Sequence, residues 1–190
     1  MQRSAITTAL LSLALLAACN ADGNAATASA AADGGEAVAA SPAGEARTIG
    51  PFQVEAIASF NEPWALNFLP DGRLLVSEKP GTLRLLDPQT RQAGEITGVP
   101  EVVYGGQGGF GDVVPHPQFA SNHLVYLSYA EAGDGDTRGA AVARATLTLD
   151  AATGGSLSNL QVVWRQVPKM SGSGHYSHRI AFDRAGKLWI

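Results

Sequence analysis

Residues 65–76 of the chain read ALNFLPDGRLLV, and residues 179–190 repeat the same plan as RIAFDRAGKLWI without a gap. In both segments an apolar run leads into a turn that contains a glycine, Gly72 or Gly186, and a second apolar run follows. Alternating apolar residues on either side of a short, glycine-containing turn are typical of a β-hairpin. The repeat therefore predicts two copies of one hairpin.

A further copy with a longer turn lies between these two. Residues 112–119 and 124–129 contain its two predicted strands, and residues 81–87 and 140–149 are expected to add a third strand to the first and middle copies. Copies spaced roughly 50 to 60 residues apart predict an all-β fold, a β-propeller built from four-stranded blades. A β-sandwich also produces short strands and turns, but the gapless repeat favours the propeller.

The chain is expected to contain only about the first two and a half blades. Its last predicted strand runs up to Ile190, the final residue of the sequence. A propeller must close into a ring, and an open ring exposes unpaired strand edges and blade faces. We therefore expect the 190-residue form to be an N-terminal fragment that is poorly stable by itself. A cooperative thermal transition of the isolated chain would count against this expectation.

The N-terminus carries an expected lipoprotein signal peptide over residues 1–18. Arg3 precedes an apolar run over residues 9–18, which is too short to span a bilayer. The run leads to Cys19, the only cysteine, in a sequence that resembles the bacterial lipobox. Cys19 is therefore the expected lipidation site, which implies a lipid-anchored protein of the periplasm or outer membrane. The alternative is an ordinary secretory signal with an incidental cysteine.

Composition divides the rest of the chain into a tether and a folded part. Residues 19–47 are rich in Ala, Gly and Ser and contain no aromatic residue, so they are expected to be a disordered tether. Residues 48–190 are expected to form the N-terminal part of the propeller domain. The net charge of −4 and the lack of a basic cluster argue against a nucleic-acid partner.

Two glycine-rich loops each present one polar side chain ahead of a predicted strand. Residues 105–109 read GGQGG, and residues 172–179 read GSGHYSHR. His175 is a candidate general base, because an imidazole titrates near neutral pH. Gln107 offers both donors and an acceptor, and its glycine neighbours allow a ligand to approach closely. The simpler alternatives are a histidine without a role and a glutamine of an ordinary turn.

The remaining candidates have weaker patterns. Arg179 can pair with a carboxylate or a ligand anion, and the favoured alternative is a cation at a strand end with a solvated head. His116, His123 and His178 are interpreted as structural residues. No set of metal-binding side chains has the spacing of a zinc site, so no metal ligand is predicted within the chain. No Gly-x-Ser-x-Gly elbow, the motif of a serine nucleophile, occurs either.

Three ordered motifs carry a family resemblance. The segments 63–78, 105–129 and 174–183 are similar to the first, second and third motifs of the soluble PQQ-dependent aldose sugar dehydrogenases, the glucose/sorbosone dehydrogenase family. This resemblance covers about residues 51–190 and implies a six-bladed propeller with PQQ at the top of its channel and Ca²⁺ bound to the quinone. It places His175 on the catalytic base and Gln107 on a glutamine that lines the sugar and cofactor pocket.

The implied reaction oxidises an aldose to its lactone. By the resemblance, His175 takes the proton of the anomeric hydroxyl, hydride passes to PQQ, and the electrons go on to an acceptor in the cell envelope. The physics is consistent, since a base must lie within hydrogen-bonding reach of its proton and the pocket must orient sugar against cofactor. Ca²⁺ would activate the quinone by polarising its oxygens.

The sequence departs from the family pattern at two positions and in its extent. Gly174 stands where glucose-specific members carry a carboxylate, so another group must orient the imidazole or the base is weaker. Pro115 replaces a small apolar residue. The PQQ and Ca²⁺ ligands are expected beyond Ile190, so the fragment alone is expected to be inactive. The alternatives are a non-catalytic propeller lipoprotein that binds carbohydrate or protein, and a metal-dependent lactonase-type propeller, for which no ligand set is present.

Overall fold

The structure is a computed structural model that describes residues 47–150 and 153–190. The predicted signal peptide, the lipidation site Cys19 and residues 20–46 of the predicted tether lie outside the described residues, and Arg47 is the first residue of a strand. The elements are β1 (Arg47–Ile49), β2 (Phe52–Val54), β3 (Pro63–Phe68), β4 (Leu74–Glu78), β5 (Thr82–Asp87), β6 (Gln92–Thr97), β7 (Phe110–Pro115), α1 (Phe119–Asn122), β8 (Leu124–Ala132), β9 (Thr137–Leu149), β10 (Gly155–Arg165), β11 (Met170–Ser171), β12 (Ala181–Phe182) and β13 (Leu188–Trp189).

The first blade consists of β3, β4, β5 and β6, which pair with their sequence neighbours in antiparallel fashion. The turn between β3 and β4 is closed by the amide of Leu69, which donates to the carbonyl of Arg73 at 2.8 Å. Gly72 adopts φ +89°, a left-handed conformation that glycine enters without steric cost. The hairpin predicted over residues 65–76 is confirmed.

The second blade consists of β7, β8, β9 and β10, again antiparallel in sequence order. Its first turn contains the short helix α1, which accounts for the longer connection in this copy of the repeat. The helix ends at Asn122 and is capped by His123, whose backbone is left-handed with φ 54° and whose amide donates to the carbonyl of Phe119 at 2.8 Å. The exposed His123 side chain therefore belongs to a structural cap.

The last copy forms the hairpin of β12 and β13, in which Ala181 pairs with Trp189 and Phe182 with Leu188. Its turn is organised by Asp183, which accepts hydrogen bonds from the amides of Ala185 and Lys187 at 2.9 and 2.8 Å. Within the described residues the chain thus forms two blades and the opening hairpin of another. The all-β propeller fold is confirmed.

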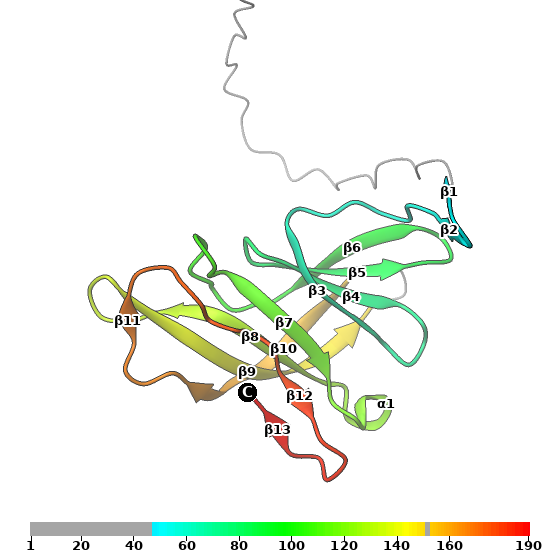
Figure 1. The fold of residues 1–190 in the computed structure, drawn as a ribbon. Coiled ribbons are helices and arrows are strands. Elements are labelled where there is room, and N and C mark those ends of the chain that lie inside the picture. The colour runs from blue at the N-terminus through cyan, green and yellow to red at the C-terminus, as the bar shows by residue number, and fades with distance from the viewer. Residues whose placement is uncertain (1–46, 151–152) are drawn as a thin grey trace, which may run out of the picture. The chain divides into compact units, whose positions relative to one another are not determined.

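One pairing was not predicted. Strands β6 and β10, the fourth strands of the two blades, run parallel and pair at Ile96 with Gly155 and at Thr97 with Ser156. This short ladder joins the two blades into one curved sheet, with β3 and β7 at its two edges (Figure 1). The alternation of apolar and polar residues within a strand does not predict this contact, because the contact depends on how the two blades lie against each other.

The main apolar core fills the space between the two blades. Its most deeply buried members, none more than 1% exposed, are Leu75, Leu83, Leu85, Ile96, Phe110, Val113, Val125, Leu127, Ala141, Ala143 and Ala145. Burying a leucine or phenylalanine side chain contributes about 1.5–3 kcal/mol each, so this core is the dominant link between the blades. Polar links reinforce it: Ser77 Oγ donates to the Gly111 carbonyl at 2.6 Å.

The packing brings the first strands of the blades side by side. Asn67 of β3 donates through its side-chain amide to the carbonyl of Val113 of β7 at 2.8 Å.

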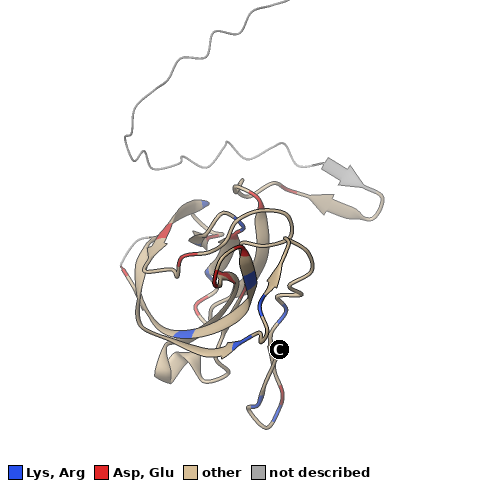
Figure 2. Cartoon of the chain, turned by 90° about the vertical axis from the view of Figure 1, so that its left-hand side faces the viewer, with Lys and Arg blue, Asp and Glu red and all other residues tan. Residues whose placement is uncertain are grey.

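Basic and acidic residues are mixed over the described part of the chain (Figure 2). Among its elements, no helix has the length and apolar character that a membrane span requires.

Candidate functional site

Three loops meet at one edge of the blades. Residues 105–109 lead into β7, residues 172–180 lead into β12, and Lys79 follows directly after the end of β4. Because β4 is antiparallel to β3, its last residues lie at the edge where β3 begins. Loops on a rigid sheet scaffold commonly carry function, and these three contain both residues that the sequence predicts for the site.

Gln107 and His175 are in direct contact, although 68 residues separate them. The backbone amide of His175 donates to the side-chain oxygen of Gln107 at 2.8 Å. The backbone amide of Gln107 donates in turn to the carbonyl of Ser173 at 2.8 Å. The two predicted residues therefore belong to one hydrogen-bonded unit, and Gln107 holds the backbone of His175 rather than its imidazole.

Gly106 allows this close approach of the two loops. It adopts φ +56°, and a Cβ atom at this position would lie 2.5 Å from the carbonyl oxygen of Ser173. Both the backbone conformation and the contact therefore require glycine. Gly174, which precedes the imidazole, differs: a Cβ atom there would meet no atom within 4 Å.

Lys79 is a site residue that the sequence analysis missed. Its ammonium donates to the carbonyl of Gly106 at 2.7 Å and lies 3.7 Å from the carboxylate of Glu62. It also lies 5.5 Å from the centre of the Tyr104 ring. The hydroxyl of Tyr104 donates to Glu62 at 2.6 Å, and this hydrogen bond raises the pKa of Tyr104. In the sequence, Lys79 is marked only by its place shortly after the predicted strand that ends the first hairpin.

A cavity of about 500 Å³ opens beside these residues. Its lining includes Trp64, Lys79, Gln107, His175 and Ser177. An imidazole, an amide, a hydroxyl and an ammonium group thus face one space against the side chain of a tryptophan. Such a set can donate and accept several hydrogen bonds at once, as a polyhydroxylated ligand requires.

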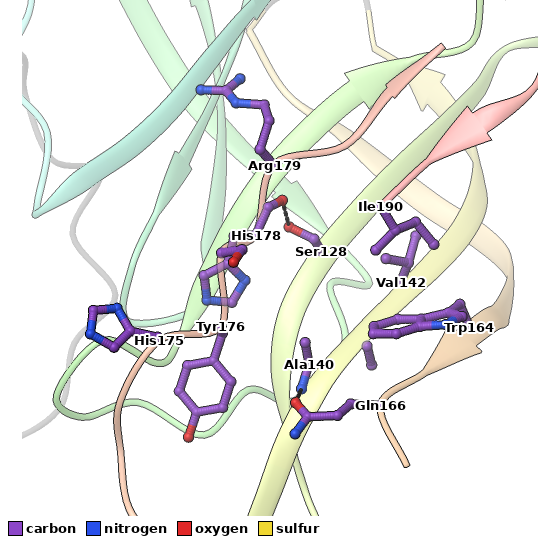
Figure 3. Close-up of a pocket in the computed structure, with 12 residues that line it drawn as sticks. Ser128, Ala140, Val142, Trp164, Gln166, His175, Tyr176, His178, Arg179 and Ile190 are labelled. Atoms are coloured by element: carbon purple, nitrogen blue, oxygen red, sulfur yellow. Dashed lines mark hydrogen bonds between the residues drawn. The ribbon is translucent and has the colours of Figure 1, made fainter. Parts of the chain in front are cut away.

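Side chains alternate along residues 175–180. His175, Ser177 and Arg179 are exposed, whereas Tyr176, His178 and Ile180 are buried. Figure 3 shows the imidazole of His175 turned away from Trp164 and Ile190, which border a second cavity of about 330 Å³. Residues 175–178 line both cavities, so this segment lies between them and His175 borders each.

Asp112 anchors the segment to the second blade and was also missed. Its carboxylate is 1% exposed and accepts hydrogen bonds from the guanidinium of Arg179 and from the amide of Ile180, each at 3.2 Å. Ser128 adds a hydrogen bond from its hydroxyl to the carbonyl of His178. The side chain of Arg179 is 75% exposed despite this ion pair. Arg179 therefore pairs with a carboxylate and is exposed to solvent at the same time.

His178 is packed beneath the loop in an aromatic environment. It is 5% exposed, with the Trp64 ring 5.6 Å and the Tyr176 ring 5.7 Å from its own. Neither ring nitrogen has a hydrogen-bond partner. Burial lowers the pKa of His178, and the negative charge of Asp112 opposes this shift only in part. The neutral imidazole is therefore the form that the fold accepts.

This burial predicts an acid-sensitive contribution to stability. Because the pKa of His178 in the folded state lies below the ordinary value of 6.5, the unfolded chain takes up its proton first as the pH falls. The free energy of unfolding should therefore be constant above that value and decrease below it. Urea unfolding at several pH values between about 7.5 and 5 should show this decrease. His178→Phe should flatten it, whereas the exposed-site variant His123→Asn should leave it unchanged.

His116 lies in the turn that precedes α1. Its Nδ1 accepts a hydrogen bond from the amide of Gln118 at 3.0 Å, and its ring stacks on Tyr126 with 6.2 Å between ring centres. The ring of Phe182 approaches edge-on at 5.2 Å. These contacts join the second blade to the hairpin of β12 and β13, which agrees with a structural role.

The chain is similar to sugar dehydrogenases in sequence and structure. The profile of the family described as Glucose / Sorbosone dehydrogenase matches residues 60–190. The aldose sugar dehydrogenase YliI of Escherichia coli (strain K12) is 38% identical over 131 residues, which cover 68% of this chain and 34% of that protein. A structure of a glucose dehydrogenase superposes with a TM-score of 0.63 at 44% identity, over 67% of this chain and 39% of that one.

A further solved structure, the PQQ-bound form of aldose sugar dehydrogenase from Streptomyces coelicolor, has a TM-score of 0.60 at 31% identity and covers 68% of this chain and 37% of that one. The chain thus spans about a third of the length of the curated relatives that it matches. The blade repeat, the two glycine-rich loops and the profile match over residues 60–190 all point the same way. The chain belongs to the glucose/sorbosone dehydrogenase family.

Proposed function

We propose that the protein containing this chain is a PQQ-dependent dehydrogenase that oxidises aldose sugars to lactones. The observation that carries the proposal is the contact between Gln107 and His175 at the edge of a 500 Å³ cavity. Family membership supplies the reaction class, and a PQQ-bound relative supports the cofactor. The loop geometry supports a role for these particular residues.

In the proposed reaction His175 is the general base. Its exposed imidazole accepts the proton of the anomeric hydroxyl, and the carbon–oxygen double bond of the lactone forms as the C1 hydrogen leaves with its electron pair. When bound, PQQ supplies an acceptor for that hydride, and Ca²⁺ polarises its oxygens. Gln107 keeps His175 at the cavity by accepting the hydrogen bond of its backbone amide. Because Gly174 carries no side chain that could orient the imidazole, Gln107 is the residue that places the base.

The described residues fit one side of such a site. The cavity has an aromatic wall in Trp64, and Gln107 and His175 supply hydrogen-bonding groups beside it. Within residues 47–150 and 153–190 no group of three or more His, Cys, Asp or Glu side chains could hold a metal ion. We therefore place the proposed Ca²⁺ ligands on other groups than these side chains.

The proposed location follows from the N-terminal sequence. Lipidation at Cys19 would anchor the protein at the periplasmic side of a membrane, with residues 20–46 as a spacer. An electron acceptor of the cell envelope would then reoxidise the enzyme. Metabolic labelling with a palmitate analogue tests the anchor: label should be present in the wild type and lost in Cys19→Ala.

Sugar-dependent dye reduction tests the activity. The enzyme that carries this chain should reduce an artificial electron acceptor with glucose or another aldose only after PQQ and Ca²⁺ have been added. Binding of sugar that is indifferent to PQQ, with no dye reduction, would instead support a non-catalytic carbohydrate-binding propeller. Calorimetric titration with the same sugars distinguishes the two results.

A further inference from the structure

We propose that Lys79 is a positioning residue that sets the place of His175 through the loop of residues 105–109. The inference rests on the proposed function and concerns a residue that contributes no step to the chemistry. Its basis is a chain of hydrogen bonds that links three successive blade loops: Lys79 after β4, Gly106 and Gln107 before β7, and Ser173 and His175 before β12.

The first link is made by the Lys79 side chain. Its ammonium is held on one side by Glu62, 3.7 Å away, and donates to the carbonyl of Gly106 at 2.7 Å. The Lys79 side chain is only 19% exposed, so water screens this contact less than it screens a surface ion pair. A lysine ammonium has three donors and no acceptor, which suits it to bind one carbonyl and one carboxylate at the same time.

The backbone of Lys79 strengthens the same link. Its carbonyl accepts a hydrogen bond from the amide of Phe110 at 2.9 Å, directly after the loop. A Cβ atom on Gly109 would lie 2.2 Å from that carbonyl oxygen and 3.0 Å from Lys79 Cγ. Lys79 therefore contacts both ends of the GGQGG loop, at Gly106 and at Gly109.

The loop passes this restraint on to the base. Gln107 follows Gly106 directly, its amide donates to the carbonyl of Ser173, and its side-chain oxygen accepts from the amide of His175, both at 2.8 Å. Movement of the Gly106 carbonyl therefore moves the two groups that hold residues 173 and 175. Misplacing a catalytic group by about 1 Å can cost a factor of about 100 in rate, so a restraint of this kind matters to turnover.

A double-mutant cycle tests the coupling in the enzyme that carries this chain, reconstituted with PQQ and Ca²⁺. Lys79→Met removes the charge and the donors but keeps the length of the side chain, and we expect kcat to fall on the order of tenfold with a smaller change in KM. In the double variant with Gln107→Ala, Lys79→Met should slow turnover less than it does in the wild type, because the side-chain link to His175 is already lost and only the backbone link to Ser173 remains. Lys187→Met, at an exposed lysine in the turn between β12 and β13, is the matched control and should leave kcat unchanged.

Amide hydrogen exchange provides a measurement that does not depend on activity. Lys79→Met should accelerate exchange in residues 172–178, where the amide of His175 is bonded to Gln107, whereas Lys187→Met should not. Unchanged exchange in Lys79→Met would overturn the inference. So would a double variant whose fold-loss of kcat equals the product of the losses in the two single variants. If no sugar is oxidised by the wild type, the proposed function fails, and the exchange result still decides the coupling.

Discussion

Replacing His175 with alanine is expected to lower turnover by about two to four orders of magnitude, the range that general base catalysis contributes. The imidazole is the proposed acceptor of the anomeric proton, and without it that proton must pass to water. The His175 side chain is exposed, and the contact that holds the residue is made by its backbone amide, which alanine retains. The thermal midpoint should therefore change little while kcat falls.

The matched control is His123→Asn, because His123 is an exposed histidine at the opposite edge of the second blade. Asparagine tolerates the left-handed backbone of this cap, where φ is 54°. Steady-state dye reduction with saturating PQQ and Ca²⁺ should show wild-type turnover in this variant. If His175→Ala also kept turnover close to the wild-type value, the base would have to be another group.

Replacing Gly106 with alanine is expected to cost about 1–3 kcal/mol of stability, the range for a strained backbone conformation, and to lower kcat/KM by at least about tenfold, as expected for a displaced catalytic group. Position 106 has φ +56°, and the new Cβ would lie 2.5 Å from the Ser173 carbonyl. The two loops must therefore separate, and this strains the hydrogen bonds that join Gln107 to Ser173 and to His175.

Gly174→Ala is the matched control, since it adds the same methyl group to the facing loop, directly before His175. A Cβ atom at position 174 meets nothing within 4 Å, and its backbone lies outside the left-handed region. Urea unfolding should give wild-type stability for Gly174→Ala and a lower midpoint for Gly106→Ala. Equal stabilities for the two variants would show that the contact between the loops is loose.

The hairpins were predictable because their signals are local. Alternation in residues 65–76 and 179–190, with Gly72 and Gly186 in the turns, specifies strands and turns over a dozen residues at a time. The pairing of β6 with β10 could not be predicted in this way. The partners in each of its two residue pairs are 59 positions apart in the chain, and the pairing depends on how closely the two blades pack.

The same division holds for the candidate site. The sequence by itself determined the hairpins of the repeat, the glycine-rich loops, and the candidacy of Gln107 and His175, since all of these depend on residues close together in the chain. Tertiary structure alone decided that Gln107 holds the backbone of His175, that Lys79 holds Gly106, and that Asp112 holds Arg179. The physical reason is that a polar side chain finds its partner by proximity in space, and packing between blades sets that proximity.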